Sequence, residues 1–116
     1  MEILFENDKS QKLFSSKTAL RKKFGEAHAV VIQRRMKQLL ALSRLSDLFT
    51  LKHLRPHELS GRRKGQFSIN TKDQFRLLFS PGHNPVPAKE DGGMDWTKIT
   101  KIVILEIGDT HEHQNR

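Results

Sequence analysis

The stretch GQFSINTKDQFRLLF, residues 65–79, decides the fold of this 116-residue chain. Apolar residues alternate with polar ones on both sides of a turn at residues 71–73. The apolar positions are Phe67, Ile69, Phe75, Leu77 and Phe79. Alternation with a period of two residues is typical of strands that bury one face. The stretch therefore predicts an antiparallel hairpin with one buried face.

Two further strands are predicted on either side of this hairpin. Residues 99–107 form the most apolar stretch of the chain, which is typical of a central strand buried on both faces. Residues 80–96 are rich in Pro and Gly and predict a long loop before that strand. Residues 2–6 alternate weakly and predict a short first strand.

The N-terminal half of the chain predicts helices. Over residues 26–42, apolar side chains recur every three or four residues, as on one face of a helix. The expected buried face consists of Ala29, Ile32, Met36, Leu39, Leu40 and Ser43. Asn7-Asp8 can cap a short helix through about Phe14, and Ser46-Asp47 can cap a further turn over residues 48–51. The fold class expected is α+β, with N-terminal helices packed on one face of a small, mostly antiparallel sheet, in one domain over residues 1–116.

The net charge of +8 is unevenly distributed along the sequence. Residues 17–64 contain 13 Lys or Arg against three acids, a net charge of +10, which leaves −2 for the rest of the chain. A basic block of this kind predicts a polyanionic partner, either nucleic acid or an acidic protein. The alternative is a solvated helix face. Membrane binding is not expected, because the apolar residues of the block suit a core better than an insertion face.

Composition excludes several classes of function. The absence of cysteine excludes disulfides, zinc–thiolate sites and thiol catalysis. No apolar run is long enough to span a bilayer, and the acidic N-terminus is not typical of a secretory signal, so a cytoplasmic protein is expected. The sequence contains no P-loop, dinucleotide-binding glycine pattern or serine-hydrolase elbow. With one Trp and no Tyr, base reading by an aromatic sheet is not expected.

His57 is the first candidate for chemistry. Imidazole exchanges protons near neutral pH and can act as a general acid or base. Cations surround it in the sequence, namely Arg55, Arg62, Arg63 and Lys64. Their charges would lower its pKa and favour the neutral, basic form. The alternative is a surface histidine beside a turn.

Arg76, Asp109 and His111 are the other candidates. Arg76 falls on the polar face of the hairpin, where a guanidinium can hold a phosphate through two parallel hydrogen bonds; the alternative is an exposed cation that discourages aggregation. Asp109 follows the last strand and can orient an imidazole or accept a proton, and His111 stands at the strand end; the alternative is a polar tail. His111-Glu112-His113 is weak support for a metal site, so neither metal nor cofactor is expected.

Four segments together resemble the HigB branch of the RelE/ParE superfamily, the toxins of bacterial toxin–antitoxin modules, also called plasmid-maintenance killer proteins. They are LRPHELSGRRKGQFSI (54–69), QFRLLF (74–79), NPVPAKEDGGMDW (84–96) and ITKIVILEIGDTH (99–111). The resemblance covers most of the chain and implies a RelE/ParE-like fold. It also implies a ribosome-dependent endoribonuclease that cuts mRNA by metal-independent 2′-hydroxyl attack, leaving a 2′,3′-cyclic phosphate and inhibiting translation.

The resemblance further implies roles for individual residues. His57 would be a general base or acid, Arg76 would stabilise the phosphorane-like transition state, and Asp109 and His111 would transfer protons or position the substrate. Contacts to the RNA backbone are expected from Arg55, Arg62, Arg63 and Lys64. Thr110 stands where some relatives have tyrosine, so a phenol is not available there.

The resemblance also implies partners, and it leaves two alternatives open. The implied partners are a HigA-type helix-turn-helix antitoxin, the 70S ribosome with its mRNA, and operator DNA bound through the toxin–antitoxin complex. One alternative is a non-enzymatic ParE-like toxin that poisons DNA gyrase. The other is a basic RNA-binding module without activity.

Overall fold

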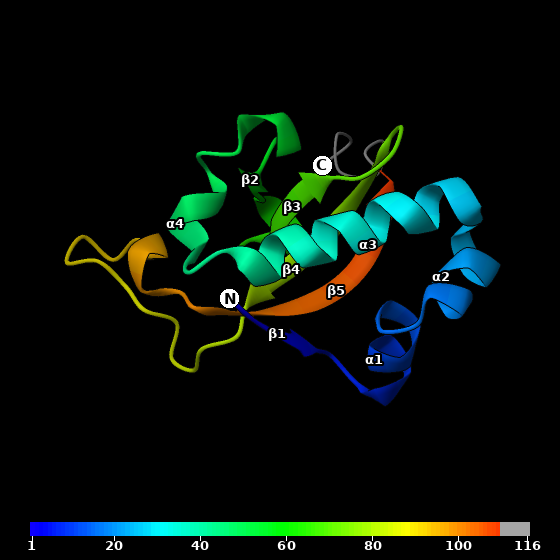
Figure 1. The fold of residues 1–116 in the computed structure, drawn as a ribbon. Helices are drawn as coiled ribbons and strands as arrows, with labels where there is room; N and C mark the ends of the chain where they lie inside the picture. Colours follow the sequence, from blue (N-terminus) through cyan, green and yellow to red (C-terminus); the bar gives the residue numbers. More distant parts are fainter. Residues whose placement is uncertain (110–116) are drawn as a thin grey trace.

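The computed structural model describes residues 1–109, and its five strands form one sheet in the order β1-β5-β4-β3-β2. The strands are β1 Glu2–Phe5, β2 His57–Glu58, β3 Phe67–Asn70, β4 Phe75–Pro81 and β5 Lys101–Asp109. Every neighbouring pair is antiparallel except β1 and β5, which are parallel. The predicted α+β class with a mostly antiparallel sheet is confirmed (Figure 1).

Four α-helices and three short 3-10 helices complete the described residues. They are α1 Asp8–Phe14, α2 Lys17–Phe24, α3 Glu26–Ala41, α4 Leu45–Leu48, η1 Lys52–Leu54, η2 Gly61–Arg63 and η3 Trp96–Lys98. The expected cap of α1 is confirmed, because the Ser10 N–H donates to Asn7 Oδ1 at 2.8 Å. The expected turn over residues 48–51 is wrong in its bounds, since α4 begins earlier, at Leu45.

Helix α2 was not predicted from the sequence. The serines at residues 15 and 16 suggest an interruption, but Ser16 is the N-cap of a new helix: its Oγ accepts from the Ala19 N–H at 3.1 Å. Leu20 is the buried residue of α2. Leu20 and the partly buried Phe24 are the two anchors that pack against the core from these eight residues, which is too weak a periodic signal for a sequence-based prediction.

Helix α3 crosses one face of the sheet, and the core lies between them (Figure 1). The helix contributes Ala29, Ile32 and Leu39, and the sheet contributes Phe67, Ile69, Leu77, Phe79, Ile102 and Ile104. Leu45 and Leu48 of α4 extend the same core. The prediction that Leu40 belongs to the buried face of the helix is wrong, because this side chain is 60% exposed. Ser43, also assigned to that face, is exposed beyond the end of α3.

The opposite face of the sheet is more polar, and this corrects the prediction for β5. Ile102 and Ile104 are buried against the helices, but Val103 is only half-buried and Glu106 is exposed. A bulge in the β4–β5 ladder leaves Leu105 without a partner across the strands. β5 is therefore a central strand that is buried mainly on its helix-covered face, at Ile102 and Ile104, and not on both faces.

Within residues 1–109, no helix is both long and apolar enough to cross a membrane. The longest helix, α3, carries charged side chains along its exposed side and packs on the sheet with the other.

Candidate active site

One row of residues crosses four strands on the face of the sheet opposite α3. His57 pairs with Ser68, Ser68 with Leu78, and Leu78 with Glu106. Residues directly opposite one another in an antiparallel ladder point to the same face. Leu78 is fully buried and forms the apolar floor of this face. Arg76 lies two residues from Leu78 on β4 and thus on the same face.

The Arg76 guanidinium is fixed in place by protein acceptors. Nε donates to Ser68 Oγ at 2.8 Å, and Nη2 donates to the Ser68 carbonyl oxygen at 3.2 Å and to the Arg55 carbonyl oxygen. Nη1 has no acceptor among the described residues. Two nitrogens of the guanidinium are thus held by the protein, and Nη1 can donate to a bound anion. Because the side chain is already fixed, binding would cost little further conformational entropy.

The backbone at Arg55 contributes to this arrangement. Arg55 ends η1 in the left-handed conformation, with φ of 50° and ψ of 56°. That region is uncommon for a residue with a long side chain. In this conformation, the Arg55 carbonyl oxygen accepts from Arg76 Nη2. Such conformations cost free energy and are found preferentially at functional sites.

The electrostatics of the face favour a neutral imidazole. Partial burial, followed by the positive charges of Arg76 and Arg55, lowers the pKa of the His57 imidazole below its ordinary value of 6.5. Burial and the charge of Arg55 also lower the pKa of the Arg76 guanidinium, which still stays charged at neutral pH. The site thus combines a proton acceptor with a fixed cation, the two groups needed to deprotonate a hydroxyl beside a phosphate.

Arg63 and Glu106 form the far side of the same face. Arg63 Nη2 lies 2.8 Å from Glu106 Oε1, and Arg63 Nη1 donates to Gln66 Oε1 at 2.9 Å. The Arg63 side chain is only 18% exposed. Two of its nitrogens are bonded to protein oxygens and the third, Nε, is buried, so unlike Arg76 this guanidinium presents no exposed free nitrogen to RNA.

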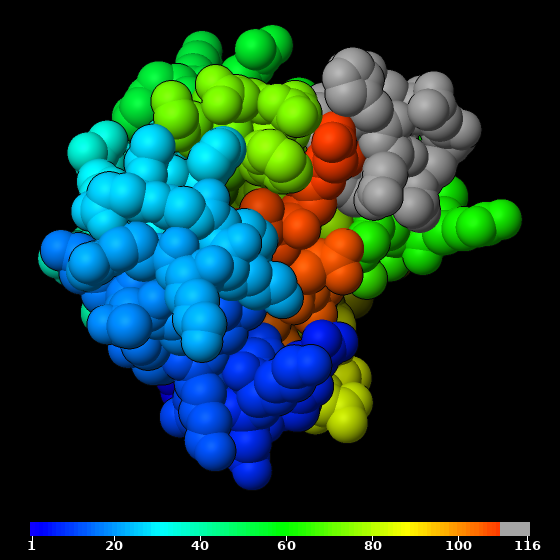
Figure 2. Space-filling model, turned by 90° about the vertical axis from the view of Figure 1, so that its right-hand side faces the viewer, coloured from blue at the N-terminus to red at the C-terminus, as the bar shows by residue number. Residues whose placement is uncertain are grey.

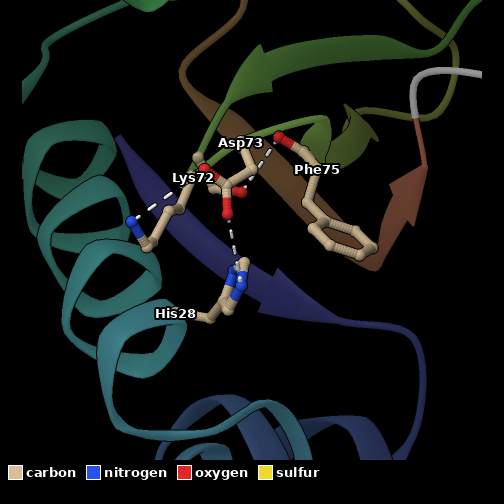
Figure 3. Close-up of polar contacts among 5 residues, drawn as sticks. His28, Lys72, Asp73 and Phe75 are labelled. Atoms are coloured by element: carbon tan, nitrogen blue, oxygen red, sulfur yellow. Dashed lines mark hydrogen bonds and ion pairs between the residues drawn. The ribbon is translucent and has the colours of Figure 1, made fainter.

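Asp109 is placed away from this group by the strand register. Its partner across the ladder is Phe75, whereas Arg76 is paired with Gly108. Asp109 therefore shares the helix-covered face with Phe75, and His57 and Arg76 lie on the other. Phe75 packs edge-on against His28 of α3, with ring centroids 5.2 Å apart. Figure 3 shows this end of the sheet, where His28 Nε2 lies 3.8 Å from Asp73 Oδ2. His111 and Thr110 lie outside the described residues.

The predicted basic block divides into two surfaces. Arg55, Arg62 and Lys64 are exposed on the segments around β2 and η2, which border the His57 face. The cations of the helices lie on other elements. Those of α2 are all exposed, and they are Lys17, Arg21, Lys22 and Lys23. Within this helical group, Arg21 Nε is paired with Glu26 Oε2 at 2.7 Å.

The sequence-based predictions assign no role to Ser68 or Glu106, which lie on the same face of the sheet as Arg76. Ser68 is 1% exposed and is the serine that fixes Arg76. Its signal is present in the sequence, since a small hydroxyl stands between two large apolar residues, Phe67 and Ile69. Glu106 is likewise the single acid within the apolar stretch of residues 99–107. A polar residue inside an apolar strand marks the face that leaves the core.

No group of three or more His, Asp or Glu side chains placed to hold a metal ion occurs within residues 1–109. In comparisons with protein-family models, with curated proteins and with solved structures, the chain matches none.

Proposed function

We propose that this chain is a HigB-type toxin that cuts mRNA on the ribosome, in the cytoplasm, as a metal-independent endoribonuclease. One observation carries the proposal: Arg76, held through Nε and Nη2, presents Nη1 on the same face of the sheet as the neutral His57 imidazole. The family resemblance of residues 54–69 and 74–79 supplies the substrate class. Neither a gyrase poison nor a passive RNA-binding module needs a proton acceptor beside an anchored cation.

The proposed reaction uses the two groups in one step. His57 takes the proton of the ribose 2′-hydroxyl, and the 2′-oxygen attacks the adjacent phosphorus. The bond between phosphorus and the 5′-oxygen breaks, which gives a 2′,3′-cyclic phosphate and a 5′-hydroxyl. Arg76 stabilises the negative charge on the phosphoryl oxygens of the transition state. The resemblance implies proton transfer or substrate positioning by His111, and we propose that His111 protonates the leaving 5′-oxygen.

The proposed partners follow from the charge and from the resemblance. Exposed Arg55, Arg62 and Lys64 would contact the phosphates on either side of the scissile bond. The wider positive surface would hold ribosomal RNA through counterion release. A HigA-type antitoxin would bind the toxin, and the complex of the two would bind operator DNA.

The test is induced expression in cells, with RNA 5′ ends mapped for the wild type and for the variants His57→Ala and Arg76→Ala. We expect cuts within translated codons in the wild type and none in either variant. His53→Ala is the matched control, because His53 is an exposed histidine of the same segment. Within the described residues its side chain makes no hydrogen bond, and only its backbone carbonyl accepts one, from Asn70 Nδ2.

Three outcomes would contradict the proposal. Growth arrest without RNA cuts would favour gyrase poisoning or RNA binding without cleavage. Cuts that persist in His57→Ala would exclude His57 as the base. Loss of cleavage in His53→Ala to the same extent would show that the segment, and not the imidazole of His57, is what cleavage requires. Circular dichroism and thermal unfolding of each variant would show that it is folded.

A further inference from the structure

The edge of β5 is only partly covered by β1. The two strands pair from Lys101 to Ile104, and then the chain leaves β1 at Phe5 and turns into α1. β5 itself continues to Asp109. Residues 105–108 therefore have no neighbouring strand on this side within the described part of the chain.

The bulge determines which backbone groups face this free edge. The Gly82 N–H donates to the Lys101 carbonyl oxygen at 2.8 Å, so Lys101 and Val103 bond to β4 in the regular alternation. Leu105 is the extra residue, and the alternation restarts with Glu106 opposite Leu78. Ile107 then turns its N–H and C=O away from β4, towards the free edge. Unpaired backbone groups of this kind are a template for an added strand.

A pocket of about 360 Å³ lies directly beside the free edge. Leu105 and Ile107 line it from β5, and Leu13, Phe14 and Phe24 line it from α1 and α2. Figure 2 shows this part of β5, in orange to red, at the surface beside the blue helices. The pocket can therefore accept apolar side chains from a segment whose backbone pairs with Ile107.

Charge indicates what kind of segment fits. Lys9 and Lys23 stand at the rim of the pocket, together with the acids Glu6 and Glu106. Glu106 is already paired with Arg63 at 2.8 Å, which leaves two lysines against one acid, Glu6, in the lining. A second copy of this chain is a poor occupant, because each copy carries a net charge of +8.

We propose that the free edge of β5 and its pocket bind an extended, acidic segment of a partner protein, which adds a strand beside residues 105–108. Its alternate apolar side chains fill the pocket, and its acidic residues meet Lys9 and Lys23. Main-chain hydrogen bonds supply affinity and the pocket supplies specificity, as in other cases of strand addition. The surface is inferred without reference to the proposed reaction, although β5 is the strand next to Arg76.

The experiment uses a synthetic peptide in which valine alternates with glutamate, and a counterpart with lysine in place of glutamate. Binding to the full chain is measured by calorimetry, and hydrogen exchange of the backbone amides is measured by NMR. We expect the glutamate peptide to bind at least about tenfold more tightly than the lysine peptide, because of the positive rim. We also expect it to slow exchange of the Ile107 amide.

Two variants locate the site. Leu105→Lys places a charge in the pocket and should weaken binding at least about tenfold. Val103→Lys is the control, since it changes another half-buried residue of β5 in the part that β1 covers, and it should leave binding unchanged. Both variants are first checked for an unchanged thermal transition.

The proposal is overturned if the Ile107 amide is unaffected by the peptide, or if both variants weaken binding equally. It is also overturned if the Ile107 amide is protected in the free chain and becomes exposed when the chain is truncated after Asp109, because the occupant is then the chain's own residues 110–116. RNA cleavage by Leu105→Lys, measured without peptide, shows separately whether the proposed function stands.

Discussion

Replacing Ser68 by alanine removes the acceptor that holds Arg76 Nε. In the wild type this bond is 2.8 Å long and its acceptor is 1% exposed. Hydrogen bonds to charged groups contribute about 1.5–3 kcal/mol to stability. Because Arg76 is half-buried and water can reach part of its guanidinium, we expect the free energy of unfolding to fall by about 1–2 kcal/mol. For a chain of this length, that loss lowers Tm by roughly 4–8 °C.

The assay is urea unfolding of four proteins: the wild type, Ser68→Ala, Arg76→Met and the double variant. If the Nε–Oγ bond causes the loss, Ser68→Ala should cost about 1 kcal/mol less in the Arg76→Met background. Ser80→Ala is the matched control. Ser80 is a half-buried serine of β4 whose hydroxyl makes no hydrogen bond within the described residues, and its replacement should change stability by less than about 0.5 kcal/mol.

Additivity of the two substitutions would refute this reasoning, since it would mean that Ser68 stabilises the sheet by packing alone. A loss for Ser80→Ala equal to that for Ser68→Ala would refute it as well. In either case the fixed position of Arg76 would need another source, such as the Arg55 carbonyl oxygen.

Three further predictions follow from burial, charge and titration. Leu39 is 0% exposed, so Leu39→Ala should lower the free energy of unfolding by about 2–5 kcal/mol. Leu40 is 60% exposed, so Leu40→Ala should change it by less than about 0.5 kcal/mol. Similar urea midpoints for the two variants would contradict the described orientation of α3. NMR titration should give the His57 imidazole a pKa below 6.5. Arg76→Gln should raise this pKa without returning it to 6.5, because burial is the larger cause of the shift. An unchanged pKa in Arg76→Gln would show that the charge of Arg76 does not affect the imidazole. Ribosome association, measured by sedimentation, should weaken at least about tenfold between 50 and 200 mM salt, and a flat response would assign the basic surfaces to another partner.

The hairpin and α3 were predictable because their signals are local. Each depends on side chains a few residues apart, alternating in residues 65–79 and recurring every three or four residues in 26–42. β2 gave no such signal, since it has two residues and both are exposed. It is a strand only because β3 is available as a partner, and a partner far along the chain cannot be read from local periodicity.

The sequence indicated candidate site residues one by one, but it did not show which face of the sheet each of them lies on. Counting alternate positions from Ile104 along β5 places Asp109 on the face of Arg76. The bulge adds Leu105 without a partner and reverses this parity, so that Asp109 is paired with Phe75 instead. A single unpaired residue therefore separates one predicted site residue from two others. Glu106, two positions after buried Ile104, indicates that the two faces of the strand have exchanged by that point, but the sequence does not show which residue is the extra one.

The pairing of β5 with both β1 and β4 has a consequence for synthesis of the chain. β5 follows all the other described strands in the sequence, so β1 and β4 cannot pair with it until residues 101–109 have been translated. The row of paired residues from His57 across Ser68 and Leu78 to Glu106 also forms only when β5 pairs with β4. Long-range pairing of this kind folds slowly and exposes nascent chains to aggregation. The face that carries His57 and Arg76 is therefore completed only after every other strand of the described sheet has been translated.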